Sequence, residues 1–159
     1  MSSDEGMAPT PPLGDIETRA DCERLVRAFY LRALDDPIIG WIFTDVAHLD
    51  LEAHLPVVAS FWETVLLGAQ TYRGGTFAPH AAIHARIGLR PGHFQRWLTL
   101  WRTTVDAHFV GDRAEGAKAH AVRVARAFEG RLRTLAPAID PTPAAGGLTV
   151  TVHGPATRA

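Results

Sequence analysis

Apolar residues recur at helical spacing in four long stretches of the chain, and residues that break helices lie between those stretches. The pattern predicts amphipathic helices over residues 21–34, 53–67, 93–109 and 114–135, and a shorter helical segment over 80–86. The residues predicted to face inward are Leu25, Val26, Phe29, Tyr30, Ala33, Leu55, Val58, Trp62, Val65, Leu66, Phe94, Trp97, Leu98, Trp101, Val105, Ala117, Ala121, Val124, Ala125, Phe128, Leu132 and Leu135.

Proline and glycine residues set the predicted limits of these helices. Pro37 ends the first helix, because the residue before a proline is driven out of helical geometry. Pro56 fits only the first turn of a helix, so the second helix should begin close to His54 or be kinked there. Residues 38–43 are too apolar for a free loop and should pack against the domain, whereas 69–79 and 88–92 are predicted loops.

The organisation that follows is one all-α domain of five or six helices, spanning residues 15–136. Residues 1–14 are rich in Pro, Ser and Gly and form a predicted flexible leader. Residues 137–159 are mostly Pro, Gly, Ala and Thr, so we expect a disordered or loosely docked tail.

The composition excludes several classes of protein. The formal net charge of −1 gives no sign of binding to nucleic acid or to an anionic membrane. Cys22 is the only cysteine, which excludes an internal disulfide and any cysteine-rich metal site. No apolar run approaches the roughly 20 residues that span a bilayer. Asp4 and Glu5 are unlike a secretory signal, so we expect a cytoplasmic protein.

Residues 50–101 hold four of the eight histidines and three of the four tryptophans. Imidazoles among large apolar groups suit a flat, apolar ligand that carries a metal, and this pattern suggests a haem pocket. Zinc is the competing interpretation, because His80 and His84 have the i, i+4 spacing of a zinc pair. No Asp or Glu lies between Glu63 and Asp106, however, so a third zinc ligand and a carboxylate base are missing there.

Several linked motifs make the chain resemble the truncated haemoglobins, specifically their third group, over about residues 15–135. The motifs are Leu25-Val-Arg-Ala-Phe29-Tyr30, Ile42-Phe43, His54 followed by Phe61-Trp62 and Leu66-Leu67-Gly68, Tyr72-Arg-Gly74, and His93-Phe94-Gln-Arg-Trp97. The resemblance implies a compact truncated globin fold, in which two pairs of helices form a sandwich around haem. Each motif alone is common, whereas their order and spacing together are specific.

The resemblance also implies a role for individual residues. His80, eight residues after Tyr72, corresponds to the proximal iron ligand. Tyr30, His54 and Trp97 would stabilise a ligand on the distal side of the iron. Phe29, Phe43, Val58 and Phe94 would line the haem pocket, and Arg86 or Arg90 would pair with the haem propionates.

The choice of proximal ligand stays open between His80 and His84. His80 lies 17 positions before Trp97, a longer spacing than the family pattern, whereas His84 lies 13 positions before it. The spacing from Tyr72 favours His80. His84 could otherwise contact a haem propionate or water. His93, His108 and His120 are interpreted as ordinary core or surface histidines, and Trp62 and Trp101 as packing residues.

The resemblance implies a globin that binds dioxygen and other diatomic ligands. Nitric oxide dioxygenation, peroxidase-like chemistry and ligand sensing are all compatible with it, and fold analogy cannot choose among them. The chain has no flavin or nicotinamide motif, so turnover would require an external reductase. We expect a monomer or weak dimer. The alternatives are a helical binding module without haem and a zinc-binding helical protein.

Overall fold

The computed structural model describes residues 11–135, and this part of the chain is helical without strands. The elements are α1 (Arg19–Leu34), a π-helical turn η1 (Ile42–Val46), α2 (Leu51–Leu67), α3 (Phe77–Ile87), α4 (Pro91–His108) and α5 (Asp112–Leu135). The all-α prediction is confirmed. The predicted tail and residues 1–10 of the predicted leader lie outside the described residues.

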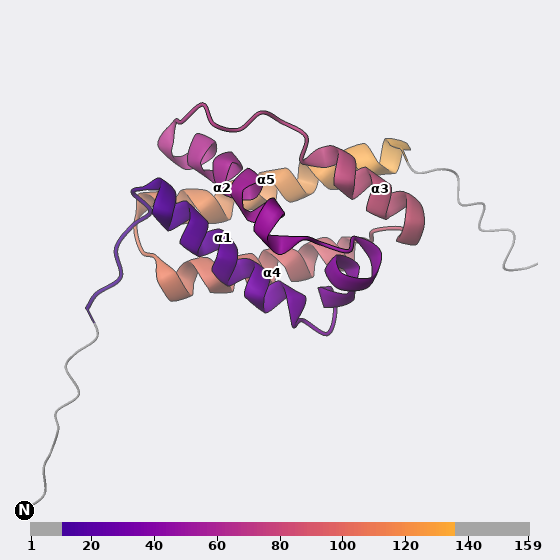
Figure 1. Cartoon of the computed structure of the whole chain (residues 1–159), viewed down its shortest axis with the longest axis horizontal. Coiled ribbons are helices and arrows are strands. Elements are labelled where there is room, and N and C mark those ends of the chain that lie inside the picture. Colours follow the sequence, from indigo (N-terminus) through magenta and orange to yellow (C-terminus); the bar gives the residue numbers. More distant parts are fainter. Residues whose placement is uncertain (1–10, 136–159) are drawn as a thin grey trace, which may run out of the picture.

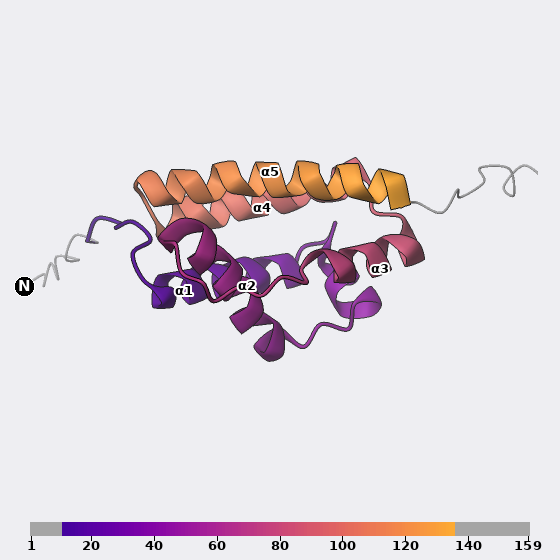
Figure 2. The ribbon, with the colours of Figure 1, turned by 90° about the horizontal axis from the view of Figure 1, so that it is seen from above.

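The helices form two layers. Figure 2 shows α4 and α5 side by side in one layer, with α1, α2 and α3 in the other. The main contacts join α1 to α2, α4 to α5, and α1 to α4 across the layers. The loop after α2 runs back along the molecule, so that α3 lies beyond the N-terminal end of α2, beside the C-terminal part of α5, and also contacts η1 (Figure 1). This arrangement is the predicted sandwich of two helix pairs.

Every helix begins earlier than predicted, by two residues in α1, α2, α4 and α5 and by three in α3. Helix α2 begins at Leu51, because the side chain of Asp50 accepts a hydrogen bond from the Ala53 N–H and caps the first turn. Pro56 therefore lies inside the helix and not in the first turn, where the missing N–H of proline predicts it. Helix α3 begins at Phe77, one turn before the predicted segment.

The predicted core is largely confirmed. All five inward-facing residues predicted in α1 are buried, and the buried face of α5 consists mainly of alanines, which lets α4 approach closely. Trp101 is 1% exposed and stacks on Trp62 with a centroid distance of 4.5 Å. Its indole N–H donates to the Ala117 carbonyl at 3.2 Å. Leu135 is 55% exposed, so its assignment to the core is wrong; it is the last residue of α5.

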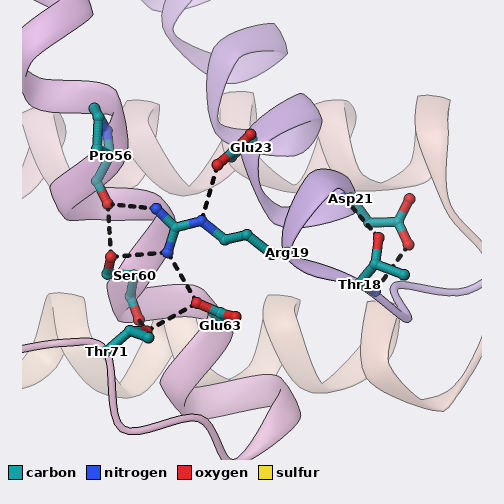
Figure 3. Close-up of polar contacts among 8 residues, drawn as sticks. All are labelled: Thr18, Arg19, Asp21, Glu23, Pro56, Ser60, Glu63 and Thr71. Atoms are coloured by element: carbon teal, nitrogen blue, oxygen red, sulfur yellow. Dashed lines mark hydrogen bonds and ion pairs between the residues drawn. The ribbon is translucent and has the colours of Figure 1, made fainter.

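Arg19 joins the first two helices at the position of Pro56. Its guanidinium donates to the Pro56 carbonyl at 3.1 Å and to the Ser60 hydroxyl and the Glu63 carboxylate, both at 2.8 Å (Figure 3). Thr71 donates to the same carboxylate at 2.8 Å, which attaches the loop after α2. The Arg19 guanidinium also donates to Glu23 at 2.9 Å and so serves four acceptors at once, which the three N–H donors of a lysine could not do.

Asp15 caps α5 from the segment before α1. Its carboxylate accepts hydrogen bonds from the N–H groups of Arg113 at 2.9 Å and Ala114 at 2.8 Å. The carboxylate approaches Gly111 so closely that a Cβ there would lie 2.4 Å from Asp15 Cγ. Gly111 also has a φ of 144°, which disfavours any other residue. The first helical residues of α5 are thus fixed by a contact between distant parts of the chain.

We expect Asp15→Ala to lower the free energy of unfolding at pH 7 by about 1 kcal/mol, as for other helix caps. Partial burial acts to raise the pKa of Asp15, but the N–H donors outweigh it and the net pKa lies below its ordinary value of 3.8. A carboxyl group with a lowered folded-state pKa stabilises the protein above its unfolded-state pKa and loses this contribution as the pH falls through the folded-state value. The difference between variant and wild type should therefore shrink below about pH 4.

Urea denaturation at several pH values measures this difference. Glu17→Gln is the matched control, because Glu17 is an exposed acid two positions from Asp15. A loss of stability in Asp15→Ala that stayed the same down to pH 2 would show that the carboxylate charge does not act in the cap.

Candidate functional site

A deep, mostly apolar cleft lies between the two helical layers and opens to solvent. Its empty space, counted with the mouth, is about 1200 Å³. Its lining comes from α1, η1, α2, α3, α4 and α5, with Tyr30, Ile39, Ile42, Phe43, His54, Val57, Val58, Phe61, Trp62, Gly75, Thr76, Pro79, His80, Ile83, Leu89, His93, Phe94, Trp97, Val124, Ala125 and Phe128 around it. The cleft therefore brings together most of the residues that the sequence singled out.

One wall carries a tyrosine–histidine pair. The hydroxyl of Tyr30 on α1 lies 2.7 Å from Nε2 of His54 on α2. Phe43 packs edge-on against the Tyr30 ring with centroids 5.8 Å apart. Burial raises the pKa of Tyr30, so the phenol stays protonated and keeps its proton for donation. Burial, with a smaller contribution from His80, lowers the pKa of His54, which favours a neutral imidazole.

A second histidine faces the cleft from α3. Nδ1 of His80 lies 2.6 Å from the backbone carbonyl oxygen of Thr76, and the imidazole packs on the Phe128 ring with centroids 4.8 Å apart. A carbonyl oxygen only accepts hydrogen bonds, so Nδ1 must carry the proton. Burial lowers the pKa of His80, against an opposing effect of that hydrogen bond, and keeps the ring neutral. Nε2 of His80 therefore has a free lone pair, as a metal ligand requires.

His84 and Arg86, also on α3, are directed elsewhere. Nδ1 of His84 accepts the Leu89 N–H at 2.9 Å and so helps to end the helix. A neutral His84 then carries its proton on Nε2, which leaves no lone pair for a metal. Neither residue is among those lining the cleft. Arg86 donates to the Val46 carbonyl at 2.5 Å and fastens α3 to η1.

Besides Tyr30, three of the aromatic residues predicted to line the pocket border the cleft and one lies behind its wall. Phe43, Phe94 and Trp97 line the cleft. Phe29 is not among the lining residues: it is 2% exposed and packs behind the wall, with ring centroids 5.2 Å from Tyr30 and 5.9 Å from Trp97. Val58 lines the cleft one helical turn from His54.

His93 also lines the cleft, although the sequence suggested only an ordinary histidine. Its Nδ1 accepts the Arg90 N–H at 3.0 Å in the first turn of α4. The neutral ring therefore carries its proton on Nε2 and can donate a hydrogen bond. The sequence could have indicated this position, because His93 lies four residues before Trp97 and so on the same face of the helix. Trp62, predicted as a packing residue, is 2% exposed and also borders the cleft.

The described residues, 11–135, include no group of three or more His, Cys, Asp or Glu side chains arranged to hold a metal ion. A zinc site built from protein ligands alone needs at least three. A histidine with a free Nε2 lone pair at a wide apolar cleft, such as His80, instead suits a metal that a planar organic group already holds by its other positions.

Comparison with known proteins shows one clear structural similarity. The chain is similar to the crystal structure of a group III truncated haemoglobin from Campylobacter jejuni, with a TM-score of 0.63 and 21% sequence identity. The match covers 76% of this chain and 95% of the other. No protein-family model matches the sequence, and no curated protein matches it. The fold is thus that of a truncated globin, as predicted.

The structure offers no helix between residues 11 and 135 with the length and apolar character needed to cross a membrane.

Proposed function

We propose that the chain is a haem-binding globin whose iron is ligated by Nε2 of His80. The observation that carries the proposal is the His80 imidazole, which has its Nδ1 proton engaged at Thr76 and its free lone pair on Nε2. Histidines that bind metals usually donate their other N–H to a carbonyl or carboxylate in this way. The fold shared with a truncated haemoglobin supports the same proposal.

The cleft fits the group that would bind there. Its lining is dominated by aliphatic and aromatic side chains, which suit a porphyrin ring, and it opens to solvent, where charged propionates can stay hydrated. His54 and His80 belong to different walls of the cleft. One side of the ring plane would then have a ligand to the iron and the other would have hydrogen-bond donors.

Bound haem would supply an iron that takes up dioxygen and other diatomic gases. The residues of the chain would act on the bound ligand. Tyr30 presents a protonated hydroxyl beside His54, and Trp97 adds an indole N–H at the cleft. Donors fixed in a site of low polarity stabilise the partial negative charge of bound dioxygen. His93 also lines the cleft, and its Nε2 proton would serve an anionic group bound there.

We further propose that the globin acts on nitric oxide or reactive oxygen species, as a dioxygenase or a peroxidase-like enzyme. A neutral His54 within hydrogen-bonding distance of Tyr30 is suited to moving a proton on the distal side, which the peroxidase-like reaction requires. Turnover would depend on an external reductase. The sequence supports work in the cytoplasm, without a nucleic-acid or membrane partner, by a monomer or weak dimer.

Titration of the haem-free protein with hemin tests the proposal. We expect uptake of one haem per chain with a sharp Soret band, and a shift of that band when carbon monoxide is added after reduction. Failure to bind one equivalent would contradict haem binding and favour a helical binding module. Binding of zinc without haem would favour the zinc alternative.

A further inference from the structure

We propose that Tyr72 is a positioning residue, which holds His80 in the orientation and tautomer needed to bind iron. This inference rests on the proposed function. Tyr72 belongs to the motif Tyr72-Arg-Gly74, yet its side chain does not line the cleft. It lies in the loop between α2 and α3, before Gly74 and Gly75, and its side chain is half-buried.

The hydroxyl of Tyr72 holds Thr76, the residue that precedes α3. The phenol oxygen accepts the Thr76 backbone N–H at 3.1 Å, and the two hydroxyl oxygens are 2.8 Å apart. Thr76 is the N-cap of α3, yet its side chain makes no capping hydrogen bond to the helix. An N-cap residue normally caps with its own side chain. Here the Thr76 hydroxyl is engaged by Tyr72 instead.

Thr76 is also the residue that holds His80. Its carbonyl oxygen accepts the Nδ1 proton of His80 at 2.6 Å. The Tyr72 hydroxyl contacts both the backbone N–H and the hydroxyl of Thr76. The position of the Thr76 carbonyl therefore depends on the Tyr72 hydroxyl. A chain of hydrogen bonds thus runs from Tyr72 through Thr76 to the imidazole that would bind iron.

Other contacts of α3 do not replace this link. No side chain of α3 is fully buried, so the position of the helix is set by a few contacts at its surface. Phe77 packs against Phe128, and Arg86 reaches the Val46 carbonyl, but neither contacts Thr76 through a hydrogen bond. Phe77 thus packs the N-terminal turn of α3 against α5, while the hydrogen bonds that fix Thr76 itself come from Tyr72.

Tyr72 is itself anchored on α2. Its ring packs edge-on against Phe61 with centroids 5.2 Å apart, and its N–H donates to the Thr64 hydroxyl at 3.2 Å. Helix α2 also carries His54 on the other wall of the cleft. The link through Tyr72 therefore joins the element bearing His54 to the carbonyl that orients His80.

The test is Tyr72→Phe, which keeps the ring packing and removes the hydroxyl. Nitrogen-15 NMR of the haem-free protein reports which ring nitrogen of His80 carries the proton. We expect one neutral tautomer, protonated on Nδ1, in the wild type, and a mixture of two in the variant. Thr71→Val is the control, because it removes a hydroxyl from the same loop. The partner of the Thr71 hydroxyl is Glu63, which does not contact Thr76 or His80 by a hydrogen bond. This control should leave the His80 signals unchanged.

A second measurement uses the protein loaded with haem and reduced. Loss of the hydrogen bond to a ligating histidine weakens it as an iron ligand. We expect the iron–histidine stretching band to move to lower frequency in Tyr72→Phe, and haem to dissociate up to about 10-fold faster, at the low end of such effects. The control should match the wild type in both.

Unchanged His80 signals and an unchanged iron–histidine band in Tyr72→Phe would overturn the inference and leave Tyr72 a packing residue. A matching disturbance at His54 would overturn it too, because the hydroxyl would then be supporting the whole cleft. The NMR measurement needs no haem. Failure of the chain to bind haem would refute the proposed function, while the effect of Tyr72 on His80 would still be measured.

Discussion

Replacing His80 by alanine is expected to abolish defined haem ligation while the helices stay folded. Losing a hydrogen-bond partner of a metal ligand typically costs about 10–100-fold in affinity, and losing the ligand itself should cost more. The change should have little effect on stability without haem, because α3 has no fully buried side chain. Haem titration measures the affinity, and far-ultraviolet circular dichroism confirms that the helices remain.

His84→Ala is the matched control, on the same helix and one turn away. Its Nδ1 accepts the Leu89 N–H at the end of α3, so its loss should leave the Soret band in place. Added imidazole should restore a ligated spectrum in His80→Ala by occupying the space left by the side chain. A normal spectrum in His80→Ala, together with a lost one in His84→Ala, would exchange the roles of the two histidines.

The sequence predicted the helices because burial in this fold follows helical periodicity closely. In α1 and α4 the apolar positions repeat at three and four residues, and the structure buries most of them. Helix α2 starts two residues before the predicted 53–67, because the backbone hydrogen bond that Pro56 cannot make is offset by other contacts. Capping by Asp50 and the hydrogen bonds of Arg19 to the same turn allow the helix to begin earlier.

Part of the candidate site could not have been predicted from spacing. His80 and His84 lie one turn apart on the same helix, so periodicity gives them similar directions. The difference between them is the partner of each Nδ1: a carbonyl oxygen for His80 and an N–H for His84. Those partners depend on the backbone path at the two ends of α3. Sequence pattern carries no information on that path.

Tyr30→Phe is expected to speed dissociation of dioxygen from the haem-loaded protein by roughly 10–100-fold. A hydrogen bond to a charged partner contributes about 1.5–3 kcal/mol, and each 1.4 kcal/mol is about a factor of ten in rate. The raised pKa of Tyr30 keeps the hydroxyl protonated over the working pH range, so the donor is always present. Phenylalanine keeps the ring contacts with Phe29 and Phe43, so the change removes the hydroxyl alone. Stopped-flow displacement of dioxygen by carbon monoxide measures the rate.

Carbon monoxide is the internal control, because it is less polarised than dioxygen when bound and gains less from a donor. Its dissociation rate should change much less than that of dioxygen. His54 complicates the single variant, since it loses its partner at 2.7 Å and becomes free to donate to the ligand in place of Tyr30. The double variant Tyr30→Phe/His54→Leu removes that substitute and should release dioxygen faster still. If dioxygen leaves wild type and both variants at the same rate, the Tyr30 hydroxyl serves only His54. Stabilisation of the bound ligand would then rest on Trp97 and His93, the other residues with N–H donors that line the cleft.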